Sequence, residues 1–253
     1  MSVTIDAAVP TPDAAPIPSP LARVGLIFTR PTRAWTGLDQ RVQWWFPLLI
    51  VAGAYALALL ATYHKSYLPM IMNSIDQRVA SEQMSADQAA QVERMYGSPG
   101  GMAIMTSILS VQYLLVIFVF SLLVWLGGAF ILGRPFRYRL ALEVTWWAEL
   151  VRLVQVVADH AVAYFGGLDL LHVHTGFGVL LPEPETPSKL FTAAGRFLDM
   201  LGPLGLWYAA VLVLGLSALS GAPRKAAAWV GGGIYLIFAL LLAALSGLSA
   251  PSS

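Results

Sequence analysis

The sequence contains no cysteine. The chain therefore forms no disulfide, has no thiolate nucleophile and cannot hold zinc on thiolates. Charged residues are also scarce, at 11% of 253 residues, whereas about a quarter of the residues of a soluble domain are charged. The net charge is +1, and no cluster of lysines and arginines forms the basic face that nucleic acid requires. These absences exclude thiol chemistry and nucleic-acid partners.

Catalytic and cofactor-binding motifs are absent as well. The sequence has no H-E-x-x-H zinc motif, no G-x-S-x-G nucleophile turn and no glycine-rich phosphate loop. The glycines at 231–233 lie inside an apolar run, where they favour close helix packing. We therefore expect a protein that is not an enzyme and carries no cofactor.

Long apolar blocks make up most of the chain, which is 57% hydrophobic. A membrane-spanning helix needs about 20 mostly apolar residues. The predicted spans are 44–63, 102–132, 140–163, 200–219 and 226–245. The fold class predicted is an all-α, polytopic membrane protein with five transmembrane helices. Residues 1–20 are rich in proline and alanine and predict a disordered tail, so the membrane domain is expected to cover 21–247.

The basic residues predict the orientation of the spans, because cytoplasmic loops carry an excess of lysine and arginine. With the N-terminus inside, nine basic residues fall on the inner side and five on the outer side. The inner set is Arg23, Arg30, Arg33, Arg41, Arg134, Arg137, Arg139, Arg224 and Lys225. An odd number of spans then places the C-terminus outside.

Two further helical elements are predicted outside the spans. Apolar residues recur at helical spacing between Leu21 and Phe28 and are flanked by arginines. They predict an N-terminal amphipathic helix that either lies on the inner leaflet or packs beneath the bundle as a plug. Residues 64–101 predict a helical hairpin in the first outer loop, with Ser85 and Gln88 as a capping box. The second outer loop, 166–199, is rich in glycine and proline and is expected to be irregular.

The predicted third span contains a stripe of polar and ionisable residues. At about 100° per residue, one helix face carries Thr145, Glu149, Arg152, Asp159 and His160. A charge at the centre of a bilayer costs about 2.5–3.5 kcal/mol, so we expect this face to turn toward other helices. Glu149 and Arg152 are three residues apart and are expected to pair.

The stripe has two interpretations, a proton or ion pathway and a buried ion pair that fixes helix register. The ion pair is favoured because the other spans offer only Gln112 and a few hydroxyl groups.

All four histidines fall on the predicted outer side, and His172 and His174 form an H-x-H pair. In an extended segment both of their rings would lie on one face. A zinc site needs three or four ligands in fixed geometry, and no spacing here matches a metal motif. We predict no metal site, with His64, His172 and His174 as weak candidates.

Three stretches resemble the Yip-domain family of bacterial membrane proteins. IFTRPTRAWTGL resembles the family's F-x-x-P-x-x-x-W signature. LGGAFILGRPFRYRLALEVT resembles its second span with two glycines, basic turn and start of the third span. FLDMLGPLGLWYAAVLVLGLSALSGAPRKAAAWVGGGIYLI resembles its Leu-Asp pair, tryptophan-containing segment and basic turn. The resemblance extends over residues 21–245.

The resemblance implies an all-α, five-span protein of the inner membrane with a cytoplasmic N-terminus. Eukaryotic members interact with Rab-type GTPases, and some bacterial relatives are linked to ABC exporters. The chain lacks the Tyr-Gly-Pro motif of the eukaryotic members, so GTPase binding is not carried over. The expected function is a non-enzymatic scaffold or accessory protein that contacts the lipid bilayer and a membrane-protein partner, and self-association stays open. The alternative is a small proton- or ion-coupled transporter that uses the polar stripe.

Overall fold

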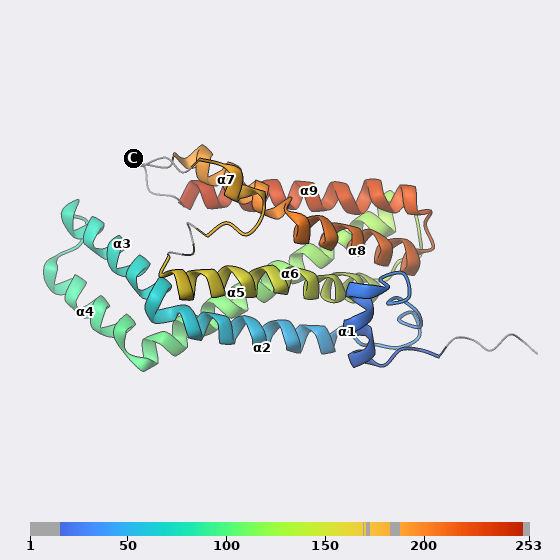
Figure 1. Ribbon diagram of the computed structural model, residues 1–253, viewed down its shortest axis with the longest axis horizontal. Coiled ribbons are helices and arrows are strands. Elements are labelled where there is room, and N and C mark those ends of the chain that lie inside the picture. Colours follow the sequence, from blue (N-terminus) through green and yellow to red (C-terminus); the bar gives the residue numbers. More distant parts are fainter. Residues whose placement is uncertain (1–15, 169, 171–172, 183–187, 250–253) are drawn as a thin grey trace, which may run out of the picture.

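The computed structural model describes residues 16–168, 170, 173–182 and 188–249, which contain helices and no strand. Long helices in this part of the chain lie side by side as a bundle (Figure 1). They are α2 (Trp45–Thr62), α5 (Pro99–Leu126), α6 (Tyr138–Gly166), α8 (Pro203–Ser220) and α9 (Arg224–Ser249). Each runs antiparallel to the long helix before it in the chain (Figure 1).

Within the described residues, four helices are long and apolar enough to cross a membrane. They cover Trp45–Ala80, Pro99–Ile131, Pro203–Ser220 and Arg224–Leu248. They correspond to four of the predicted spans. The remaining predicted span, 140–163, lies in α6, which carries five charged side chains and is not in this set. That α6 also crosses the membrane stays a prediction.

The two ends of the bundle differ. One end, which we call the α1 end, holds α1 (Pro20–Thr29), the loop between α5 and α6, and the turn between α8 and α9 (Figure 1). The other end, the hairpin end, holds α3 (Leu68–Ala80) and α4 (Ala86–Gly97), which project beyond the long helices (Figure 1). Residues 1–15, most of the predicted tail, lie outside the described residues.

The hairpin forms as its sequence predicts at the turn between its helices. The Ser85 side chain accepts a hydrogen bond from the Gln88 amide at 3.3 Å, and the Gln88 side chain accepts one from the Ser85 amide at 3.1 Å. The predicted capping box is therefore confirmed. At the base of the hairpin, the Tyr63 hydroxyl donates to the Tyr96 carbonyl at 3.0 Å, which joins the end of α2 to α4.

The second connecting segment is more regular than expected. Residues Lys189–Met200 form α7, whose first turn is capped by the Ser188 side chain. This helix packs against α9 so closely that a Cβ atom on Gly247 would lie 2.5 Å from the Lys189 carbonyl oxygen. The prediction of an irregular loop is wrong for these residues, because Ser188 supplies a helix cap and α9 supplies a surface to pack on.

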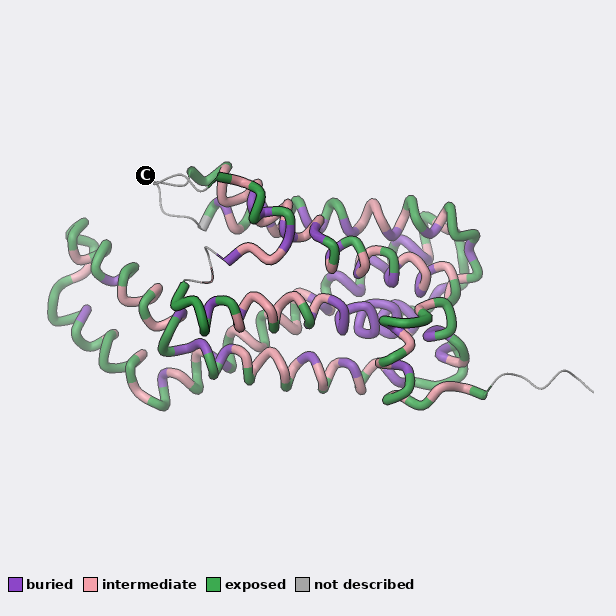
Figure 2. The backbone as a smooth tube through the Cα atoms, viewed as in Figure 1, coloured by how far each residue is buried: buried purple, intermediate pink, exposed green. Residues whose placement is uncertain are grey.

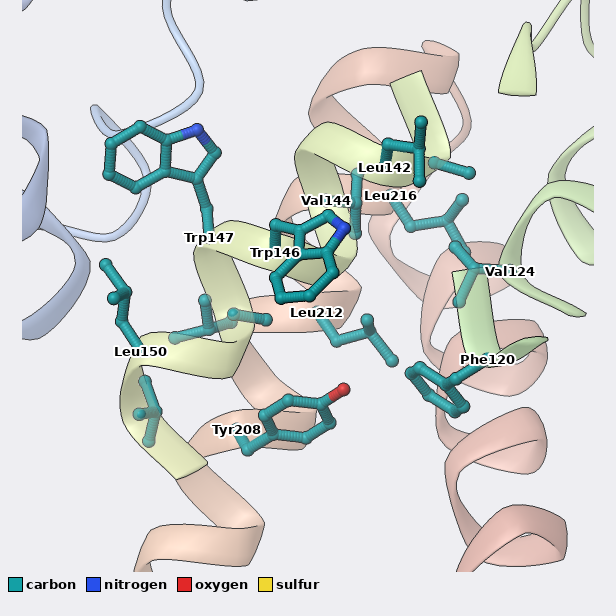
Figure 3. Close-up of a cluster of buried hydrophobic side chains, with 14 of the residues drawn as sticks. Phe120, Val124, Leu142, Val144, Trp146, Trp147, Leu150, Tyr208, Leu212 and Leu216 are labelled. Carbon is teal, nitrogen blue, oxygen red and sulfur yellow. The ribbon is translucent and has the colours of Figure 1, made fainter. Parts of the chain in front are cut away.

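The hydrophobic core is centred on the first half of α6. Every residue from Leu140 to Val151 is buried (Figure 2). Figure 3 shows Trp146 directed toward Leu212 of α8, while Trp147 points away from that cluster toward the N-terminal part of the chain. α6 packs against α2, α5 and α8, so it is the central helix of the fold.

Candidate functional site

The polar stripe of α6 faces the interior, and its centre is an ion pair. Glu149 is 1% exposed, and the Arg152 Nε atom lies 3.7 Å from its Oε1 atom. Thr145 is fully buried, and its hydroxyl has no hydrogen-bond partner among the described residues. The opposite face of α6 carries exposed valines, including Val154 and Val157. The predicted pairing is confirmed, and the charged face is turned inward.

Four tyrosines surround this ion pair, one from each of the other long helices: Tyr55 of α2, Tyr113 of α5, Tyr208 of α8 and Tyr235 of α9. The Tyr113 hydroxyl donates to Glu149 Oε1 at 2.6 Å, and the Tyr208 side chain lines a small cavity beside Arg152. The Tyr55 ring stacks on Tyr113 with centroids 4.2 Å apart. The ion pair is thus enclosed by polar groups from every long helix of the bundle.

The expectation from the sequence named only Gln112 and a few hydroxyl groups in the other spans and did not single out these tyrosines. Its statement that the other spans offer little polar chemistry is wrong. Gln112, the polar residue that it named, is exposed on the bundle surface. A tyrosine inside each apolar segment was the signal that could have identified the cluster, since a buried phenol needs a hydrogen-bond partner.

A cleft leads from the ion pair toward the hairpin end. It has a volume of about 230 Å³ and lies between α6, α7 and α9. Its polar lining consists of Arg152, Gln155, Asp159, Arg196, Asp199 and Ser246. A cavity of about 20 Å³ adjoins it, lined by Arg152, Gln155, Tyr208 and Tyr235 among others, which is enough space for one water molecule. The ion pair therefore has a polar route toward one end of the bundle.

Two aspartates that line the cleft, Asp159 and Asp199, bind the segment that precedes α7. Asp159 accepts a hydrogen bond from the Thr175 hydroxyl. Asp199 contacts His174, with 2.6 Å between its Oδ2 atom and Nδ1, and accepts from the Gly176 amide at 3.3 Å. These contacts fold the segment before α7 back onto α6 and α7.

The histidines do not gather into one group. His160 is buried and its Nδ1 atom lies 2.8 Å from the Val156 carbonyl oxygen, while His64 is exposed and His174 contacts Asp199. His172 lies outside the described residues. Within the part of the chain that the structure describes, no three His, Asp or Glu side chains are placed to share a metal ion.

At the α1 end, Arg23 is completely buried. Its Nε atom donates to Gln43 Oε1 at 3.0 Å, and its terminal nitrogens donate to the carbonyl oxygens of Ala34 and Thr36. Its guanidinium lies 5.6 Å from the Trp147 ring centroid. Burial lowers the pKa of Arg23 to about 10, although nearby Glu143 acts to raise it, so the group remains charged at neutral pH.

Arg23, which the sequence placed in the inner basic set, is thus buried at the α1 end and not exposed on its surface. The Arg23 guanidinium donates hydrogen bonds to backbone carbonyl oxygens that would otherwise lack a partner in the interior. Of the two alternatives for α1, the plug beneath the bundle matches the structure, since Arg23 and Ile27 are both buried and α1 packs against α6.

Glu143, one turn before Trp147, organises the same region. Its Oε1 atom accepts a hydrogen bond from the backbone N–H of Gln43 at 2.7 Å, and its Oε2 atom accepts one from Trp147 Nε1 at 3.1 Å. A carboxylate at this position complements the positive end of the α2 dipole. Arg139 lies 4.0 Å from Glu143 and donates to the Leu38 and Asp39 carbonyls. The buried charge thus fixes where α2 begins.

The other predicted inner residues are at the surface of the α1 end. The exposed ones are Arg30, Arg33, Arg41, Arg134, Arg137, Arg224 and Lys225, and Arg139 is half-buried. They come from three segments of the chain that meet at this end of the bundle: the one between α1 and α2, the one between α5 and α6 with the start of α6, and the start of α9 (Figure 1). These residues of the predicted inner set therefore lie together at one end of the bundle, and that this end is cytoplasmic stays a prediction.

The model of one protein family, the Yip1 domain, matches residues 24–245. The chain belongs to the Yip1 domain family. The match covers nearly the whole chain, from within α1 to within α9, and includes Glu143 and the Glu149–Arg152 ion pair, while Arg23 lies one residue before it. Neither a search of curated proteins nor a search of solved structures finds a match. This Yip-type protein is an integral membrane protein with several apolar helices.

Proposed function

We propose that this protein is a five-pass inner-membrane protein that acts, without catalysis, as a scaffold or accessory subunit of another membrane complex, such as an ABC exporter. α6, the third span along the chain, would cross the membrane in addition to the four apolar helices, since it lies among α2, α5 and α8 and turns its charged face inward. The N-terminus and the α1 end would be cytoplasmic. The exposed basic residues at that end support this orientation.

The α3–α4 hairpin is the observation that carries the scaffold proposal. It projects beyond the long helices (Figure 1), and most of its residues are exposed. Only Ile75 and Ala89 within its helices are buried. A folded hairpin that contributes so little to the core is suited to contact a second protein. Its exposed face carries the acidic residues Asp76, Asp87 and Glu93.

Purification in mild detergent followed by mass spectrometry tests this function. The wild-type protein should recover a membrane-protein partner in stoichiometric amount. Reversing the charges of Asp76, Asp87 and Glu93 to lysine should reduce recovery at least tenfold, because electrostatic complementarity governs such contacts. Arg30→Glu, an exposed charge at the opposite end, is the matched control and should retain the partner. A partner-free monomer that transports a solute would contradict the proposal.

The tyrosine-enclosed ion pair supports a second function, a proton- or ion-coupled transporter. It offers polar groups on every long helix and a cleft that reaches them from the hairpin end. Under this function, Glu149→Gln would abolish flux in proteoliposomes and leave the protein folded. The buried half of α6, Leu140–Val151, closes the route toward the α1 end, so transport would need a rearrangement of the bundle.

A further inference from the structure

We propose that the cleft between α6, α7 and α9 binds a small zwitterion that carries a primary ammonium and a carboxylate or phosphate group. This inference goes beyond the scaffold function and does not depend on it. The cleft holds two arginines and two aspartates in about 230 Å³. A pocket for a drug-sized molecule is larger, at about 300–1,000 Å³, so the ligand is a group of few atoms.

The arginines supply the site for the acidic end of the ligand. Arg152 lies at the deep end of the cleft, where its Nε atom faces Glu149 and its side chain stays 25% exposed. Arg196 lies on α7, is 27% exposed, and donates to the Leu170 carbonyl at 2.8 Å. Guanidinium groups bind carboxylates and phosphates through paired hydrogen bonds. Both arginines line the cleft and keep part of the side chain exposed, so each offers N–H donors to an anion there.

Asp159 supplies the site for the ammonium. Asp159 lines the cleft, and Thr175 donates to its Oδ1 atom, so its second oxygen supplies the acceptor for the ammonium. Asp199 is less suited, because His174 and the Gly176 amide already occupy its two oxygens and Arg196 lies 4.0 Å away. Asp159 and Arg152 are seven residues apart on α6, a rise of about 10 Å, and the Arg152 side chain reaches back toward Glu149. Arg196, which lines the same cleft, is therefore the arginine that shares a short ligand with Asp159.

The arginines and aspartates that line the cleft disfavour a ligand that carries a single charge. A lone anion would approach two aspartates, and a lone cation would approach two arginines, so either would meet a like charge at short range. A zwitterion satisfies both signs at once. The cleft is also closed toward the α1 end by the buried half of α6. It is therefore a blind site that holds its ligand. A free amino acid or phosphoethanolamine offers this chemistry, and so does the headgroup of an aminophospholipid.

Binding to the full-length protein, purified in detergent and stripped of lipid, tests the proposal. Calorimetry with phosphoethanolamine and with glycine probes a free zwitterion, and native mass spectrometry with phosphatidylethanolamine probes a lipid headgroup. Binding in either arm supports the site and identifies the source. Inorganic phosphate and phosphatidylglycerol carry the anion alone and should bind at least tenfold more weakly. Equal binding of these probes, or no binding of any zwitterion, would overturn the proposal.

Variants locate the binding to the cleft. Arg196→Gln and Asp159→Asn should each weaken it at least tenfold. Arg94→Gln and Glu82→Gln change exposed residues of the hairpin and should leave it unchanged. Because the chain has no native cysteine, Ser246→Cys gives a second measurement that needs no charge change. The ligand should slow maleimide labelling of that cysteine several-fold, and an unaltered labelling rate would contradict the site.

Discussion

A single carboxylate in the middle of the protein joins α6 to α5, within an ion pair that has tyrosines of the other long helices around it. Glu149 pairs with Arg152 on its own helix and accepts a hydrogen bond from Tyr113 of α5. Its burial is nearly complete. An acidic group so placed is stable only while its partner and donors remain, because an isolated charge in the interior is strongly unfavourable. The free energy of unfolding should therefore be more sensitive to a change at Glu149 than to a change at an exposed charged residue.

We expect Glu149→Gln to destabilise the protein by about 3 kcal/mol, because it leaves the Arg152 charge buried without a counter-charge. The melting temperature in detergent, followed by tryptophan fluorescence, should fall by about 6–12 °C. The double variant Glu149→Gln/Arg152→Gln removes both charges and should recover at least half of the loss. A single variant as stable as the wild type, with lost flux, would instead favour the transporter.

The ion pair was predictable from the sequence, and its surroundings were not. Helical spacing alone places Glu149 beside Arg152. The tyrosines come from four segments separated by long stretches of chain, and periodicity within one segment cannot show which faces meet. His174 and Asp199 are brought together by a turn and a helix that the glycine- and proline-rich composition concealed.

At the scale of an element, α1 is attached to the bundle chiefly through one arginine. Arg23 bonds carbonyl oxygens of the following loop and contacts Gln43 and Trp147. The apolar spacing of α1 suits a membrane surface as well as a protein surface, which is why the sequence left both open. The partners of Arg23 decide between them, and these lie up to 124 positions away along the chain.

Replacing Arg23 by glutamine should release α1. The variant loses several hydrogen bonds to buried carbonyls at a cost on the order of 3 kcal/mol. Limited proteolysis in detergent should then cut within residues 20–40 at least tenfold faster than in the wild type. Arg30→Gln, on an exposed residue at the end of the same helix, should keep the wild-type rate. Equal protection of Arg23→Gln would show that apolar contacts alone hold α1.

At the scale of the whole molecule, the question is whether α6 crosses the membrane with the other long helices. Four spans were recognisable from length and composition. α6 departs from that pattern because it carries charged side chains. These charges are stabilised by residues of neighbouring helices, which the sequence alone does not identify. Its central position and its inward polar face are the properties expected of a span buried among other spans.

Cysteine labelling can decide the number of crossings, since the chain has no native cysteine. Pro135→Cys and Leu168→Cys place single thiols at exposed positions before and after α6. In intact cells, an impermeant maleimide should label Leu168→Cys and spare Pro135→Cys until the membrane is opened. Labelling of both at the same rate would mean that α6 does not cross.

The contact between Glu143 and the start of α2 bears on how the chain is made. The Gln43 amide is satisfied by a carboxylate 100 residues further along the sequence. During translation α2 therefore emerges well before the group that completes its first turn. The start of α2 therefore gains this contact only after the first part of α6 has been synthesised, so a chain truncated before residue 143 lacks it.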